Sequence, residues 1–136
     1  MPESTIPWSA GSWTTPPHHI RQDADAAAPL HVTASSGSDA WVRTAYGFVH
    51  DSAHALVAPL TVGAAMEVTF HADWQGEFDQ AGIYVDVDAE HWVKAGVEFA
   101  DSHLGLGAVV TDGASDWSVG HVDEWLESEI TVRVSR

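Results

Sequence analysis

Residues 79–99 show the clearest pattern of apolar and polar positions in the chain. Every second residue is aliphatic over 83–87, a polar turn follows at 88–91, and the alternation resumes over 92–99. The pattern predicts a β-hairpin with one aliphatic face. The other face is too rich in rings and in charges of both signs for ordinary solvated surface, so we expect it to contact a ligand. It carries Gln80, Tyr84, Asp86, Trp92, Lys94 and Glu98.

Shorter alternating runs recur elsewhere, separated by turn residues, and no segment has a helical period. Many short strands without helices favour an all-β fold, an antiparallel β-sandwich or jelly roll. We expect residues 1–29 to be a lead-in that packs on a sandwich domain formed by 30–136. Gly105 and Gly107 are expected to admit a large ring across the sheet. The predicted strands are residues 30–34, 41–49, 53–57, 65–71, 80–87, 92–99, 104–111 and 129–134.

The composition narrows the range of partners. The chain has 136 residues, suited to one domain, and 45% of them are hydrophobic, enough to fill a core. Its formal net charge of -15 should repel phosphate backbones and anionic membranes, so neither nucleic acid nor a membrane is expected as a partner. No cysteine is present, which excludes thiolate chemistry and disulfides. No signal-like or membrane-spanning run is found, so a cytoplasmic location is expected.

Four separated motifs, in order, resemble the regulation-of-enolase family. They lie at residues 41–48, 78–83, 92–99 and 109–118, and the likeness extends over about 30–136. That family is a domain of largely unknown function in the concanavalin A-like lectin/glucanase superfamily. The resemblance implies a concanavalin A-like sandwich. Family members look longer than this chain, which implies that further strands normally complete the fold. We therefore expect exposed sheet edges that favour a homodimer or marginal stability.

The superfamily's glucanases carry Glu-x-Asp-x-x-Glu, and the nearest candidate here is the run from Asp86 through Asp88 to Glu90. Its spacing differs, and Glu90 falls in the predicted turn, so turn carboxylates are the favoured interpretation. A glycoside hydrolase stays a minor alternative, and no catalytic residue is assigned. His50 and His54 flank another predicted turn without any need to converge, and His18 and its neighbour lie in a loop bounded by prolines. No metal and no cofactor are expected.

The best candidate site combines flat rings with polar groups at their rim, as a sugar or another small polar ligand requires. The alternative is a set of cross-strand ion pairs covered by rings. The predicted function is a non-catalytic binding module for a carbohydrate or carbohydrate-like molecule. The alternative is a regulatory domain that binds a metabolic enzyme, which the family name implies. Asp116 and Trp117 are expected in a polar loop with Ser115 and Ser118, where Trp117 either joins the edge of the cleft or plugs the end of the sandwich. The candidate ligand-binding residues are Arg43, Tyr46, Gln80, Tyr84, Asp86, Trp92, Lys94, Glu98, Asp116 and Trp117.

Overall fold

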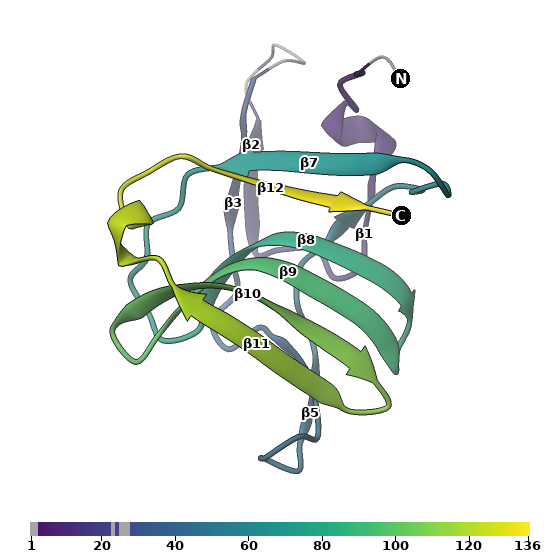
Figure 1. Ribbon diagram of the computed structural model, residues 1–136. Coiled ribbons are helices and arrows are strands. Elements are labelled where there is room, and N and C mark those ends of the chain that lie inside the picture. Colours follow the sequence, from purple (N-terminus) through teal and green to yellow (C-terminus); the bar gives the residue numbers. More distant parts are fainter. Residues whose placement is uncertain (1–2, 23, 25–27) are drawn as a thin grey trace. The chain divides into compact units, whose positions relative to one another are not determined.

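Strands account for nearly all of the regular structure in the computed structural model, which describes residues 3–22, 24 and 28–136 (Figure 1). The helices among these residues are short 3₁₀ turns. The elements are η1 (Trp8–Ala10), β1 (Ser12–Trp13), β2 (His19–Gln22), β3 (Leu30–Thr33), β4 (Ala40–Val42), β5 (Val49–Asp51), β6 (Leu56–Val57), β7 (Ala65–Phe70), β8 (Asp79–Asp88), β9 (His91–Ala100), β10 (His103–Asp112), β11 (Ser115–His121), η2 (Asp123–Trp125) and β12 (Ile130–Ser135). The prediction of an all-β, antiparallel fold is confirmed.

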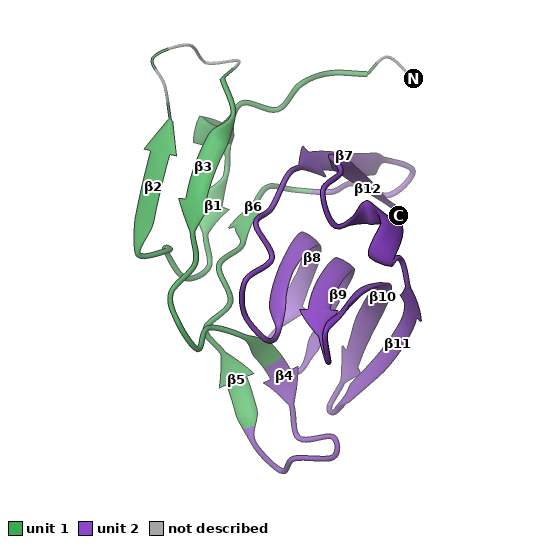
Figure 2. Ribbon diagram, turned by 90° about the vertical axis from the view of Figure 1, so that its left-hand side faces the viewer, with its two compact units in different colours: residues 1–40, 49–59 green, residues 41–48, 60–136 purple. Residues whose placement is uncertain are grey.

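The chain divides into two compact units, coloured separately in Figure 2. Unit 1 comprises residues 1–40 and 49–59. Within it β2 and β3 form an antiparallel hairpin, and β1 pairs with β6. Unit 2 comprises residues 41–48 and 60–136 and contains the long strands. The expected packing of residues 1–29 on the sandwich stays a prediction, and residues 1–2, 23 and 25–27 of that segment lie outside the described part of the chain.

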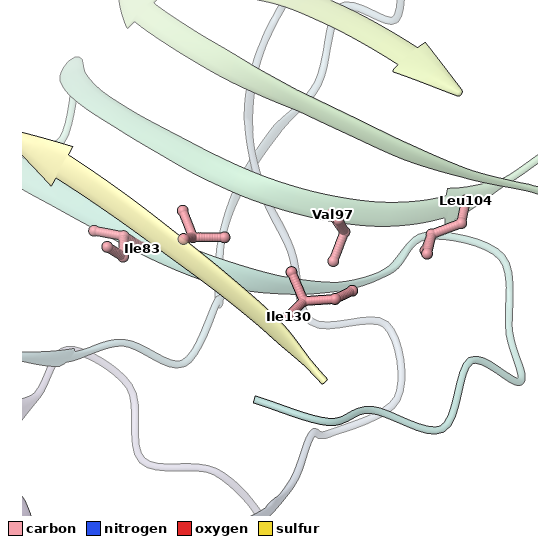
Figure 3. Close-up of a cluster of buried hydrophobic side chains, with 5 residues drawn as sticks. Ile83, Val97, Leu104 and Ile130 are labelled. Atoms are coloured by element: carbon pink, nitrogen blue, oxygen red, sulfur yellow. The ribbon is translucent and has the colours of Figure 1, made fainter. Parts of the chain in front are cut away.

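Unit 2 is built from two antiparallel layers. A four-stranded sheet has the order β11-β10-β9-β8, and the ribbon formed by β7 and β12 lies over one of its faces (Figure 1). The alternation of 129–134 predicted a half-buried strand, and β12 buries two aliphatic side chains against the sheet. The core cluster between the layers, shown in Figure 3, consists of Ile83, Val97, Leu104, Ile130 and Val132.

A row of glycines crosses the middle of the four-stranded sheet. Gly82 pairs with Gly96, and Gly96 pairs with Gly107. A Cβ added at Gly107 would lie 2.0 Å from the carbonyl oxygen of Ser118, and one at Gly82 would lie 2.1 Å from that of Ala95. The backbones of neighbouring strands thus approach each other along this row as only glycine permits. The expectation that Gly105 and Gly107 admit a large ring is wrong, because backbone atoms lie closest at Gly107 and the Val119 side chain lies closest at Gly105.

Two predicted strand boundaries are also wrong. Residues 41–49 were expected to form one strand, but positive φ angles of 60° at Arg43, 65° at Ala45 and 72° at Gly47 turn the chain into a loop between β4 and β5. The second error is at β11. Residues 115–118 were expected to form a polar loop, but they belong to a strand that pairs with β10 over seven positions, from Gly105↔His121 to Thr111↔Ser115.

Candidate functional site

The four-stranded sheet of unit 2 has one face that packs on β7 and β12 and an opposite face that we call the polar face. Strand register places the candidate residues of β8 and β9 together on the polar face. The cross-strand pairs are Gln80↔Glu98, Tyr84↔Lys94 and Asp86↔Trp92. The alternation in the sequence therefore assigned these six side chains to the correct face. From β10 and β11 the polar face receives Gly105, Gly107, Val109, Thr111, Ser115, Trp117, Val119 and His121.

Tyr84 and Trp92 form a stack on the part of this face that β8 and β9 build. Their ring centroids are 5.4 Å apart with an angle of 28° between the planes, and Lys94 Nζ lies 6.0 Å from the Trp92 ring. Trp92 is only 4% exposed, whereas Tyr84 is half-buried. A ligand on this face would therefore meet Tyr84, with Trp92 as a rigid support behind it.

Arg43 and Tyr46 belong to a second feature, the aromatic loop, defined as residues 41–48. Tyr46 stacks on Phe48 with centroids 5.1 Å apart and meets the edge of Trp41 at 5.9 Å. Tyr46 is 60% exposed and Phe48 is 43% exposed. The loop thus presents two stacked rings to solvent.

Hydrogen bonds brace the aromatic loop from within. The Arg43 N–H donates to Phe48 O at 2.8 Å, and the N–H groups of Tyr46 and Gly47 donate to Arg43 O at 3.2 and 2.7 Å. The Trp41 indole N–H donates to Thr44 O at 2.9 Å.

The Arg43 guanidinium links the aromatic loop to the sheet. It donates to Gly113 O at 3.2 Å and lies 3.7 Å from a Glu90 carboxylate oxygen, so it spans the turns after β8 and after β10.

Asp116 and Trp117 lie on strand β11 and not in the polar loop that the sequence suggested. Because they are neighbours on β11, their side chains point to opposite faces of the sheet. Trp117 pairs with Val109 on the polar face and is partly exposed, while Asp116 pairs with Val110 on the other face. Of these two residues, only Trp117 can take part in a site with Tyr84.

Asp88 of the possible hydrolase motif serves the β8–β9 turn. Asp88 Oδ1 accepts from the Glu90 N–H at 2.9 Å and from His91 Nδ1 at 2.7 Å, and His91 Nε2 lies 3.3 Å from Asp112 Oδ1. The hydrogen bond from His91, followed by that from the Glu90 N–H, lowers the pKa of Asp88, and the hydrogen bond to Asp88 raises the pKa of His91. The strand register shifts at an irregularity between Asp86 and Asp88. The interpretation as turn carboxylates agrees with these contacts.

His54 also has a structural environment, in unit 1. Its Nε2 accepts from the Ser35 N–H at 3.1 Å, so its Nδ1 carries the proton and donates to Thr15 O at 2.9 Å. Both ring nitrogens are therefore committed to backbone groups, and neither is available to a metal. The same residues line a shallow hollow of about 170 Å³, together with Ser36, Gly37 and Ser38.

Sequence reasoning overlooked a cluster of His103, His121 and Asp123. The two imidazoles stack with centroids 4.2 Å apart, and His103 Nδ1 lies 2.8 Å from Asp123 Oδ2. The three residues come from β10, β11 and η2, and only the register of β10 with β11 brings them together. That register was the missing signal, because β11 was taken for a loop.

A family model for proteins of unknown function, DUF1349, matches residues 13–136 of the chain. The chain belongs to this family. It is 36% identical over 133 residues to Regulation of enolase protein 1 of Saccharomyces cerevisiae, a match that covers 94% of the chain and 66% of that relative. An uncharacterized protein of Emericella nidulans is 32% identical over 65 residues, covering 45% of the chain and 32% of the relative.

A solved structure agrees with these sequence matches. The crystal structure of a functionally unknown protein from Saccharomyces cerevisiae superposes with a TM-score of 0.77 at 32% identity, covering 94% of this chain and 67% of that one. The likeness to the regulation-of-enolase family is confirmed, as is the all-β sandwich class. The chain spans 66% of the length of the yeast relative that it matches. In the part of the chain that the structure describes, no helix is long and apolar enough to cross a membrane.

Proposed function

We propose that this chain is a non-catalytic regulatory domain that binds a metabolic enzyme through the aromatic loop. The observation that carries the proposal is the exposed stack of Tyr46 on Phe48 in a loop held by its own hydrogen bonds. Aromatic side chains dominate the energetic centres of protein interfaces because they bury a large apolar area with few rotatable bonds. A loop that is already ordered loses less entropy on binding than a flexible one.

Backbone strain in the loop supports the same interpretation. Arg43 and Ala45 adopt positive φ angles of 60° and 65°, a region that residues with a Cβ rarely occupy. Strained residues cluster at binding sites, where the surrounding structure holds them in place. Tyr46 lies between these two strained positions and Gly47 and is 60% exposed. A strained backbone and exposed aromatic rings do not stabilise the folded chain. Their combination in the aromatic loop is therefore better explained by binding of a partner.

The name of the yeast relative supports a metabolic enzyme as the partner. The yeast relative is named for regulation of enolase, so we take enolase as the partner to test. The net charge of -15 would speed association with a basic patch and make the association sensitive to salt.

The test measures binding of purified enolase to the chain at low salt, by biolayer interferometry, together with the rate of the enolase reaction. The wild-type chain should bind and change that rate. Tyr46→Ala and Phe48→Ala should each weaken binding by about tenfold or more, as expected for central aromatic anchors. Val62→Ala, at a highly exposed position outside the loop, should bind like the wild type. Failure of the wild-type chain to bind enolase at low salt would overturn the proposal.

A second function is favoured by the polar face. Tyr84 stacked on buried Trp92, with Lys94 beside the rings, offers a flat platform and a cation to a carbohydrate or another small polar ligand. Thermal-shift measurements with a panel of sugars and sugar phosphates would test it. A ligand of this kind should raise the melting temperature of the wild-type chain and of Phe48→Ala, but not of Tyr84→Ala. A melting-temperature shift that persists in Tyr84→Ala would contradict this second function. So would the absence of any shift of the wild-type chain across the panel.

A further inference from the structure

The cluster of His103, His121 and Asp123 lies on unit 2 where β10 begins, β11 ends and η2 begins (Figure 1). His121 pairs with Gly105, and the Val122 N–H donates to Leu104 O at 2.8 Å, so His103 and His121 project from the same face of the sheet. Gly105 contributes no side chain between them. The register therefore leaves the two imidazoles facing each other.

Asp123 fixes the position of this pair. Its Oδ1 accepts from the Leu104 N–H at 2.8 Å, and its Oδ2 accepts from His103 Nδ1 at 2.8 Å. These two hydrogen bonds hold the Asp123 carboxylate beside the imidazole of His103. The rings of His103 and His121 lie parallel within 12°. All three side chains are exposed to solvent, which an incoming ion can reach.

We propose that His103, His121 and Asp123 form a binding site for a divalent transition-metal ion of the zinc type. One ligand atom from each residue lies within 4.8 Å of the other two. Two ligands bound to one zinc ion at about 2.1 Å in a tetrahedral site are separated by about 3.4 Å. Closing that gap needs rotation of exposed side chains, chiefly a tilt of His121 out of the stack. No movement of the strands is required.

The chemical types of the three ligands decide which metal ions the site prefers. Two imidazoles and one carboxylate suit zinc, nickel or copper, whereas calcium and magnesium prefer oxygen ligands alone. Three protein ligands leave a coordination position for water or for a group from a partner. The strong negative charge of the chain adds a general attraction for cations.

A purely structural role explains only part of the cluster. Asp123 is needed to satisfy the Leu104 N–H, and His103 can serve as its hydrogen-bond partner. The second imidazole, His121, adds nothing to that arrangement. His91 provides the contrast, because it is a single imidazole held between the carboxylates of Asp88 and Asp112. Like the proposed metal site, His91 combines an imidazole with carboxylates, but it lacks a second imidazole nitrogen. His91 is therefore a matched control.

The experiment titrates zinc chloride into the whole chain at about pH 7.5, where free imidazole is neutral. Calorimetry would give affinity and stoichiometry, and NMR would follow the imidazole resonances. The wild-type chain should bind one zinc ion with the His103 and His121 signals shifting together. His103→Gln, His121→Gln and Asp123→Asn should each weaken this binding by about tenfold or more. His91→Gln should bind as the wild type does.

Circular dichroism should show that the exposed substitutions leave the fold intact. Zinc affinity unchanged by His121→Gln, or no shift of either imidazole at millimolar zinc, would overturn the proposal. The result does not depend on whether enolase binds, since the cluster and the aromatic loop share no residue.

Discussion

The backbone N–H of Val42 donates to Ser115 Oγ at 2.9 Å and so joins two segments that are 73 residues apart in the sequence. Ser115 Oγ also lies 2.8 Å from Thr111 Oγ1, and Val42, Thr111 and Ser115 are all buried. This small buried network holds the start of the aromatic loop against β11. The exposed rings of the loop therefore depend on a polar contact in the interior.

Ser115→Ala should lower the free energy of unfolding by about 1–3 kcal/mol, because it leaves the buried N–H of Val42 without an acceptor. A denaturant melt would measure the change. Ser118→Ala on the same strand is the control, and at that exposed position the change should stay within about 0.5 kcal/mol. Equal effects of the two substitutions would show that the buried contact contributes no stability.

Leu104→Ala should lower the free energy of unfolding by about 2–5 kcal/mol, since Leu104 is 0% exposed and its truncation opens a cavity in the core of unit 2. Leu106→Ala lies two residues further along β10, at a side chain that is 39% exposed, and should have a much smaller effect. Chemical denaturation of both variants would test this. A small loss for Leu104→Ala would mean that the two layers of unit 2 pack loosely.

Gly107→Ala should destabilise the chain by about 1–3 kcal/mol or more, because its Cβ would lie 2.0 Å from a backbone oxygen that cannot rotate away. Gly120→Ala is the matched control, with no atom within 4 Å of the added Cβ. Thermal melts of the two alanine variants would compare them directly. If Gly107→Ala melts like the wild type, the close approach of the strands does not exist in solution.

The turn between β8 and β9 should be sensitive to pH. The raised pKa of His91 stabilises the fold below about pH 6.5, and this contribution is lost as the pH rises through the folded-state value. The lowered pKa of Asp88 stabilises it above 3.8, and that contribution is lost as the pH falls through the folded-state value. The pair should therefore be strongest between about pH 4 and pH 6.5.

An NMR titration of the His91 imidazole would check this. Asp88→Asn should move the midpoint down, whereas Asp86→Asn, whose carboxylate is not among the groups that shift His91, should not. A midpoint that does not change in Asp88→Asn would contradict the assigned contact.

The sequence predicted the structure best where apolar and polar residues alternate over a long stretch, so that the two faces of the strands differ. Over 79–99 the two-residue period, together with the polar turn, specified the strands, the hairpin and the sorting of side chains between faces. How deeply each side chain is buried was not predictable in the same way. Trp92 was correctly placed on the polar face, but its burial depends on atoms far away in the sequence.

The remaining differences arise from pairing and from backbone conformation. Ser115, Asp116 and Ser118 have low strand propensity, yet pairing with β10 makes them a strand. Arg43 and Ala45 gave no sign of their positive φ angles, because such angles usually fall on glycine. The cluster with His103 and His121 depended on the same unpredicted pairing.

The position of Lys94 gives this chain a built-in chemical handle. It is the single lysine in the sequence, and its amine lies 6.0 Å from the ring of Trp92. An amine-reactive dye would attach at this one side chain, apart from the amino terminus, and would take up the emission of the neighbouring indole. A molecule that settles on the polar face would screen the amine from the reagent or alter the energy transfer. Occupancy of that face can thus be followed by fluorescence without introducing a cysteine or a tag.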